Sequence, residues 1–526
     1  MKLKLLFSLI LLVVLCSCGT DEPIETEVIE TEIETEVIIE VIETTTVAEE
    51  TTTVELEYIA PEDRTPQNRR FFDSGYYPFV MDENVIGTWE VCGFVEKIEE
   101  FPQYNWGNGV MGQLIFNERE FCTFVYDNDF RRSYDWTAGL VLDREEKINS
   151  AYVIKTIDDI DFLFYEWKTG DYTHNGTVSY YVFAREGVTV LKMFEDLRSV
   201  ARSGVFNINE SEYKFDYIKT YRYSDDAVFE GAEDYAMEIL ENAKDPGLGI
   251  RKLHETGITG EGVNVAIIDQ NLVTSPYHPE YDGKIVKYHD IGTGHDGSRG
   301  SMHGPAVASL LVGETTGVAP NANLYYVAVP SWTGDSQYFA DALYWIIEEN
   351  NNLPENEKIR VVSISAQPSG EGTTYTQNLE SYTEAVEAAT AAGILVMDCR
   401  VGFDSGFIGA AYNGGGDIND PAQCVPRYPG GKIVFPPNYI HVPNSMRTMA
   451  EHFNPDEISY AYWGQGGLSW GMPYAAGVLA MGWQVDPTLG NDEIVQILYD
   501  TCYVNDDGAH IINPPAFIEY IEGNKK

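Results

Sequence analysis

Between residues 263 and 397, short apolar runs alternate with longer segments of helical periodicity. The runs have the composition of strands buried on both faces, and they span residues 263–268, 324–329, 361–364 and 394–397. In the segments between them, apolar residues recur every three or four positions, as Phe339, Leu343 and Ile346 do. This alternation predicts a parallel sheet covered by helices on both faces, in which functional sites form at the carboxyl ends of the strands.

The length and charge of the chain set limits on its organisation and partners. A chain of 526 residues exceeds what one hydrophobic core usually supports, so we expect at least two domains. We predict a signal peptide (1–17), an acidic spacer (18–58), a β-rich domain (59–190), a connector (191–244) and the α/β domain (245–526). The 34 Lys and Arg residues face 83 Asp and Glu residues, which gives a net charge of −49. Because this charge repels polyanions, we do not expect nucleic acid as a partner.

The first residues have the pattern of an export signal. Lys2 and Lys4 precede an apolar run at 5–15, which is too short to span a bilayer and ends in Leu15-Cys16-Ser17-Cys18. This tetrapeptide resembles a bacterial lipobox, which implies cleavage before Cys18 and a lipid on its sulfur. We therefore expect an extracellular protein tethered to the bacterial membrane. The alternative is an ordinary signal peptide that contains cysteines. The acidic residues that follow predict an extended spacer, because like charges repel along it.

Five cysteines lie in the predicted folded region: Cys92, Cys122, Cys399, Cys424 and Cys502. An odd number leaves at least one thiol without an intrachain partner. In an extracellular protein, Cys92 with Cys122 and Cys399 with Cys424 are plausible disulfides, although spacing proves neither. This region contains no CxxC pair, so we expect no structural zinc.

The β-rich region alternates short strand-like runs with turns. The runs span residues 86–91, 113–116, 151–154, 162–167 and 180–183, a spacing that predicts an antiparallel barrel or sandwich. Gly87-Thr88-Trp89, residues 164–172 and Tyr181-Val182-Phe183, in this order, resemble a lipocalin-like accessory domain. Its many aromatic residues are consistent with a ligand cup or with a filled interior, and we favour the filled interior because rings supply much of a small core.

Three residues of the α/β region are candidates for chemistry. Asp269 ends the first predicted strand, His303 opens a helical segment at 303–313, and Ser469 lies between a glycine-rich loop and an apolar helix. Taken singly, each has an ordinary structural interpretation, such as a helix cap for the aspartate and the serine. The order Asp, His, Ser is that of the subtilisin triad.

These residues stand in motifs that resemble those of subtilisin-like serine peptidases. Residues 257–263 lead through the strand to Asp269, His303 is followed by Gly304, and Gly467-Leu468-Ser469 is followed by Pro473. The resemblance extends over about residues 247–520. It implies an endopeptidase for protein or peptide substrates, in which His303 takes the proton of the Ser469 hydroxyl and Asp269 holds the imidazole. This chemistry requires no cofactor. The sequence leaves open whether the chain binds a structural calcium ion.

Several positions depart from the family pattern. Gln270 and Asn271 replace a small residue and Gly, Leu468 replaces Thr, and Tyr474 replaces a common His. No inhibitory propeptide is recognisable, since the barrel-like region occupies its place.

The main departure concerns the oxyanion side of the site. After the strand at 394–397 the family has Gly-Asn, whose amide is the second oxyanion donor, whereas this chain has Asp398-Cys399-Arg400-Val401-Gly402. Loss of one such donor lowers the rate by about 10² to 10³. Arg400 or a backbone amide is a candidate substitute.

Two alternatives remain. The first is a catalytically weak or inactive binding protein of the same fold, suggested by the missing Asn. The second takes Gly467-Leu468-Ser469-Trp470-Gly471 as a lipase-type nucleophile elbow, which should follow a strand directly and would have only His510 downstream as its base.

Overall fold

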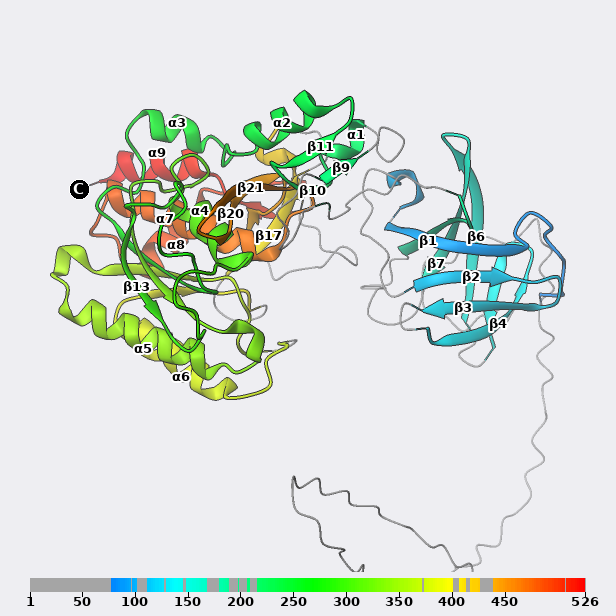
Figure 1. The fold of residues 1–526 in the computed structure, drawn as a ribbon, viewed down its shortest axis with the longest axis horizontal. Helices are drawn as coiled ribbons and strands as arrows, with labels where there is room; N and C mark the ends of the chain where they lie inside the picture. Colours follow the sequence, from blue (N-terminus) through cyan, green and yellow to red (C-terminus); the bar gives the residue numbers. More distant parts are fainter. Residues whose placement is uncertain are drawn as a thin grey trace, which may run out of the picture. The chain divides into compact units, whose positions relative to one another are not determined.

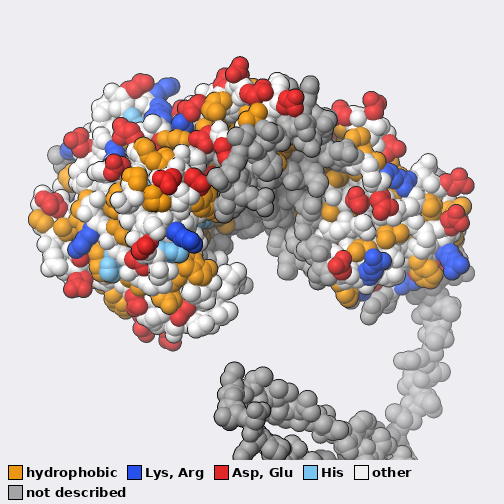
Figure 2. Space-filling model, viewed as in Figure 1, with side chains coloured by type: hydrophobic (Ala, Val, Ile, Leu, Met, Phe, Trp, Pro, Cys, Tyr) orange, Lys and Arg blue, Asp and Glu red, His pale blue; other side chains and the backbone are white. Residues whose placement is uncertain are grey.

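The computed structural model describes residues 77–525 except 96, 102–110, 127–128, 145–147, 168–178, 189–196, 198–205, 209–214, 371–372, 401–405, 413–416, 426–438 and 507. The predicted signal peptide, Cys18 and the spacer at 18–58 lie outside the described residues, as does part of the barrel motif at 164–172. Within the described residues, none of the helices combines the length and the apolar character that a membrane span requires. Figure 2 shows Asp and Glu side chains over the visible surface with fewer Lys and Arg.

Eight strands of the β-rich region form a closed antiparallel barrel, so the sandwich alternative is wrong (Figure 1). The strands are β1 (Gly87–Val95), β2 (Met111–Phe116), β3 (Phe121–Tyr126), β4 (Arg131–Thr137), β5 (Leu140–Asp143), β6 (Ile148–Ile157), β7 (Ile160–Trp167) and β8 (Ser179–Arg185). β1 pairs with both β2 and β8, which closes the barrel. The aromatic side chains of Trp89, Phe116 and Trp136 are buried in its core, in agreement with a filled interior. The rings of Phe116 and Trp136 pack edge to face.

A five-stranded parallel sheet forms the centre of the α/β region, as predicted. Its strands are β12 (Asn264–Asp269), β13 (Ile285–Asp290), β14 (Asn323–Ala328), β15 (Ile359–Ile364) and β16 (Leu395–Met397), in the order β13-β14-β12-β15-β16. Every neighbouring pair is parallel. Only β13 was not predicted, because it is an edge strand with few apolar residues.

Helices cover both faces of this sheet, and alternate residues of β12 show it directly. Val265 and Ile267 pack in one core with α4 (His303–Val312) and α7 (Gly471–Val485). Ala266 and Ile268 pack in a second core with α5 (Gln337–Asn352) and α6 (Leu379–Ala391). The other α-helices of the described residues are α1 (Phe215–Ile218), α2 (Glu233–Asn242), α3 (Ile250–Glu255), α8 (Asn491–Asp500) and α9 (Pro514–Asn524).

Further sheets complete the fold. One has the order β18-β17-β19-β23-β22 and consists of β17 (Phe407–Tyr412), β18 (Cys424–Val425), β19 (Ile440–Pro443), β22 (Tyr503–Val504) and β23 (His510–Ile511). A parallel pair joins β9 (Phe206–Ile208) to β11 (Ala227–Phe229).

A three-stranded sheet links the predicted connector to the α/β region. The hairpin of β20 (Arg447–Asn454) and β21 (Glu457–Trp463) accepts β10 (Arg222–Ser224) at the edge of β21. Ser224 donates its hydroxyl to Glu451 at 2.6 Å. Thr448 donates its hydroxyl to the carbonyl of Leu240, next to the end of α2. This part of the connector is therefore built into the α/β region.

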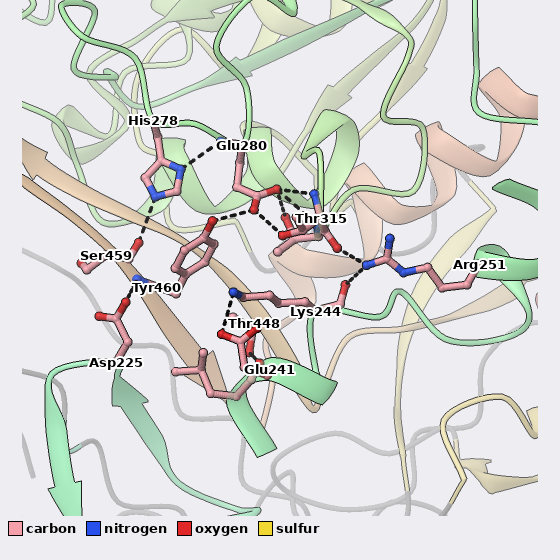
Figure 3. Close-up of polar contacts among 12 residues, drawn as sticks. Asp225, Glu241, Lys244, Arg251, His278, Glu280, Thr315, Thr448, Ser459 and Tyr460 are labelled. Carbon is pink, nitrogen blue, oxygen red and sulfur yellow. Dashed lines mark hydrogen bonds and ion pairs between the residues drawn. The ribbon is translucent and has the colours of Figure 1, made fainter. Parts of the chain in front are cut away.

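Buried polar groups join the same hairpin to the surrounding loops (Figure 3). The carboxylate of Glu280 is 1% exposed and accepts hydrogen bonds from Thr315, Thr316 and the hydroxyl of Tyr460. The ring of His278 lies beside it, with Nε2 3.0 Å from the carbonyl oxygen of Ser459. The carboxylate thus ties a loop and a hairpin strand that are far apart in sequence.

The suggested disulfides do not form. The Cys92 thiol donates to the carbonyl of Val182 at 3.5 Å and packs in a different cluster from Cys122. Cys399 follows β16, whereas Cys424 opens β18 in another sheet. The five cysteines stay as thiols, because neither suggested pair is brought together by the fold.

Candidate active site

Asp269 is the last residue of β12, so its carboxylate stands at the carboxyl edge of the parallel sheet. It is only 4% exposed. The backbone N–H of Gln270 donates to Oδ1 at 2.7 Å and fixes the carboxylate. A buried carboxylate with an oriented oxygen can hold a cationic partner strongly.

His303 supplies that partner from the first residue of α4. Its Nδ1 lies 2.7 Å from Oδ1 of Asp269, and the imidazole is 18% exposed. Because an ionised carboxylate only accepts hydrogen bonds, Nδ1 carries the proton and Nε2 is left as the basic nitrogen. Burial acts to lower the pKa of His303, but the charge and hydrogen bond of Asp269 outweigh it and raise the pKa above its ordinary 6.5.

Gly304 explains why glycine follows the histidine. A β-carbon at this position would lie 2.6 Å from the Tyr326 hydroxyl and would also overlap the carbonyl of Gln270. The N–H of Gly304 donates to the Ser301 hydroxyl at 2.9 Å, which satisfies one free donor of the first turn. The missing side chain lets α4 approach the end of β12 closely enough for His303 to reach Asp269.

Ser469 lies in the 3-10 turn η9 (Leu468–Trp470), which leads directly into α7. The Ser365 hydroxyl donates to the carbonyl of Ser469 at 2.7 Å, and the Ser469 hydroxyl donates to the carbonyl of Ser365 at 3.4 Å. Ser365 follows β15, and Ile268 of β12 is the register partner of Ile364. Ser469 is therefore held at the same edge of the sheet as Asp269.

The structure joins the aspartate and the histidine directly and the serine less directly. Trp470, the neighbour of Ser469, packs its ring on His303 with centroids 5.1 Å apart, and η9 contacts α4. Among the described residues no hydrogen bond connects the Ser469 hydroxyl to His303, since that hydroxyl is directed to Ser365. In ligand-free sites, catalytic hydrogen bonds are often long and tighten only when substrate binds.

The end of β16 differs from the sequence-based suggestion for Arg400. The guanidinium Nε pairs with Oδ2 of Asp398 at 2.6 Å, and the side chain lies over the ring of Tyr382. Burial raises the pKa of Asp398 above its ordinary value, although Arg400 acts in the opposite direction. The Nε donor of Arg400 is therefore used in a buried ion pair, which gives the side chain a structural role. Val401 and Gly402 lie outside the described residues.

Other candidate groups have structural roles. His510, the base required by a lipase-type arrangement, lies in β23 with its ring stacked 4.2 Å from that of Tyr499. Within the described ranges, no group of three or more His, Cys, Asp and Glu side chains is arranged to hold a metal ion.

The sequence prediction missed Ser365 and Ser301 as parts of the site. Ser365 had a usable signal, because it directly follows a predicted strand at the edge where Asp269 also lies. Ser301 had no such signal in the sequence, because its role is to accept the hydrogen bond from the N–H of Gly304.

Comparisons with known proteins relate part of the chain to subtilisin-like peptidases. Residues 260–445 match the model of the Subtilase family, a range that contains Asp269 and His303 and ends before Ser469. The alkaline protease of Alkalihalobacillus alcalophilus is 26% identical over 283 residues, or 50% of this chain and 66% of the relative. Subtilisin E of Bacillus subtilis is 30% identical over 132 residues, or 23% of this chain and 33% of the relative.

The chain thus spans less than two thirds of the length of these relatives. Among solved structures, fervidolysin from Fervidobacterium pennivorans, a keratinolytic enzyme related to subtilisin, is 17% identical with a TM-score of 0.38, covering 53% of this chain and 47% of that one. The family match and the parallel sheet together give the α/β region a subtilisin-like fold.

Proposed function

We propose that this protein is a serine endopeptidase that hydrolyses peptide bonds of proteins or peptides through an acyl-enzyme. The observation that supports it most is the 2.7 Å contact between His303 Nδ1 and the buried carboxylate of Asp269, in a segment that matches the Subtilase family. This contact leaves Nε2 unprotonated and directs the base function of the ring away from Asp269.

In the proposed reaction, Nε2 of His303 takes the proton of the Ser469 hydroxyl while the Ser469 oxygen attacks the peptide carbonyl carbon. Asp269 stabilises the imidazolium that forms. The carbon–nitrogen bond then breaks, and the departing amine takes the proton from Nε2. Water, deprotonated in turn by His303, hydrolyses the ester and restores the Ser469 hydroxyl. These steps use protein groups and water, so we predict that EDTA leaves labelling of Ser469 unchanged.

The start of α7 favours the oxyanion of this reaction. Ser469 lies in the turn that opens a helix of 15 residues, and first-turn N–H groups have no intrahelical acceptor. These donors and the positive end of the helix dipole stabilise negative charge at that position.

Covalent labelling tests the proposal. We expect a fluorophosphonate to label the full chain, and Ser469→Ala to abolish the labelling and the hydrolysis of fluorescent casein. Ser298→Ala, at an exposed serine, is the control and should label as the wild type does. A wild type that neither labels nor cleaves casein would overturn the proposal.

A second candidate, a peptide-binding protein without turnover, is favoured by the Asp398–Arg400 pair, which stands where the family has its amide donor. It predicts that peptide affinity is unaffected by Ser469→Ala and that turnover is undetectable in either protein.

We further propose that Cys18 carries a lipid that tethers the protein outside the bacterial membrane. The support is the lipobox-like tetrapeptide that ends at this residue. We expect the wild type to incorporate palmitate in cells and Cys18→Ala not to. Carbonate washing of membranes should release Cys18→Ala and leave the wild type bound, and retention of both proteins would contradict the proposal.

A further inference from the structure

The indole of Trp470 packs on both the imidazole of His303 and the indole of Trp463. Its ring centroid is 5.1 Å from that of His303, with the planes inclined at 33°. The centroid of Trp463 is 4.9 Å away on an edge-to-face contact with an interplanar angle of 80°. Two aromatic neighbours therefore fix the ring that packs on His303.

Packing rather than hydrogen bonding holds Trp470 in this position. The side chain is 3% exposed, and its Nε1 has no hydrogen-bond partner among the described residues. Gly467 provides the space, since a β-carbon there would lie 3.1 Å from Nε1. A buried indole N–H usually finds a partner, so its absence here indicates that ring contacts determine the orientation.

The predicted connector supplies a support behind Trp463. Arg222 of β10 is the register partner of Trp463, and its guanidinium carbon lies 4.4 Å from the centroid of that ring. Arg222 Nη2 also donates to Gln465 at 3.2 Å. A continuous series of contacts thus runs from a segment that precedes the parallel sheet to the imidazole.

We propose that Trp470 is a positioning residue for His303, and that Arg222 supports it through Trp463. The proposal rests on the proposed peptidase function, because it assigns Trp470 the task of holding the base while Ser469 is deprotonated. The face of an indole attracts a cation, so the ring also favours the imidazolium that forms in this step. Asp269 fixes the Nδ1 edge of the imidazole and Trp470 restrains its face.

The effect of Trp470 on the His303 imidazole can be measured separately from that of nearby charges. Asp269 is the charged group that interacts with the ring. Tyr375 and Cys399 interact electrostatically with Asp269, and burial is the main cause that raises the pKa of both side chains, so both are neutral near pH 7. A change at Trp470 therefore reaches the imidazole through ring contact.

Kinetics of the full chain give the first test. We expect Trp470→Ala to lower kcat on a fluorogenic casein peptide about five- to tenfold, with KM within about twofold, and Trp470→Phe to lose less. Arg222→Met should lower kcat by a smaller factor. Trp345→Phe and Arg360→Met are matched controls, since Trp345 stacks on His289 and Arg360 lies over Trp483, and both should keep kcat.

The second test uses a readout that is independent of turnover, the titration of His303. In full chain labelled with ¹⁵N-histidine, the His303 resonances, assigned with His303→Gln, should titrate at lower pH in Trp470→Leu than in the wild type, because leucine keeps an apolar cover over the imidazole but removes the aromatic face. They should be unchanged in Trp345→Phe. An unchanged His303 titration overturns the proposal whether or not the protein is a peptidase. A shifted titration in a protein without turnover supports the positioning role and rejects the peptidase function.

Discussion

Ser365 and Ser469 exchange two hydrogen bonds, from the Ser365 hydroxyl to the Ser469 carbonyl at 2.7 Å and from the Ser469 hydroxyl to the Ser365 carbonyl at 3.4 Å. The pair connects the end of β15 to the turn before α7. The turn that carries the proposed nucleophile is therefore held by the central sheet.

Ser365→Ala removes the shorter of these bonds. We expect about 1 kcal/mol of lost stability and a roughly tenfold lower kcat, because the Ser469 turn loses its link to β15. Thermal unfolding and casein-peptide kinetics measure the two effects. A kcat equal to that of the wild type would show that the turn needs no such support.

Gly304→Ala tests the close approach of α4 to β12. The added methyl meets the Tyr326 hydroxyl and the Gln270 carbonyl, so we expect about 1–3 kcal/mol of destabilisation and loss of fluorophosphonate labelling. Gly490→Ala is the matched control, since nothing lies within 4 Å of its added methyl. Equal melting temperatures for the two variants would contradict the packing argument.

Asp269→Asn tests the effect of the Asp269 charge on His303. With only burial acting on the ring, the pKa of His303 falls below 6.5, so the acid limb of the kcat profile moves to lower pH. At the same time kcat should fall about 10⁴-fold, because the imidazole loses its orienting carboxylate. The pH dependence of kcat from pH 5 to 9 measures both effects, and an acid limb that stays in place would be inconsistent with this pair.

Glu280→Gln tests the buried carboxylate of the hairpin junction. Burial acts to raise the pKa of Glu280, but hydrogen bonds from Thr315, Tyr460 and Thr316 outweigh it and hold the pKa below 4.5. The charge therefore stabilises the fold above that pH, and this stabilisation is lost as the pH falls through the lowered pKa.

We expect Glu280→Gln to cost about 1–3 kcal/mol at neutral pH and less below about pH 4. Melting temperatures from pH 3 to 7 measure the difference. Glu314→Gln, at a carboxylate that is 64% exposed, should change little at any pH. If the difference in melting temperature between wild type and Glu280→Gln did not change with pH, the charge of Glu280 would not be the source of the stabilisation.

Arg400→Met distinguishes an ion-pair role from a catalytic one. It leaves the fully buried Asp398 without its cation, so we expect about 3–5 kcal/mol of lost stability. In the molecules that stay folded, kcat should change less than threefold, since losing an oxyanion donor would lower it about 10²-fold or more. Lys287→Met, at a surface pair with Glu349, is the control for stability.

The strands and helices of the central sheet were predictable because burial on two faces leaves a continuous apolar signature. β12 and β15 carry it, whereas β13, with Lys287, His289 and Asp290 in six residues, does not. Asp269 and His303 could not be assigned from this apolar pattern; they were singled out by the order Asp, His, Ser and by the resemblance of their surrounding motifs to those of subtilisin-like peptidases.

Contacts between distant segments could not be predicted. The stack of Trp470 on His303 depends on a turn that no local pattern specifies, and the partner of Arg400 depends on how the chain folds back after β16. The disulfide pairs could not be predicted for the same reason, because the spacing of cysteines along the chain does not show in which sheet each cysteine lies.

Arg222 and Gln465 are separated by 243 positions along the chain, yet they meet at the edge of one hairpin. A ribosome must therefore release nearly the whole polypeptide before β10 finds its strand, and such distant pairings form slowly. The sheet that supports Trp463 therefore cannot form in a nascent chain that ends before β21, and such a chain also lacks Ser469.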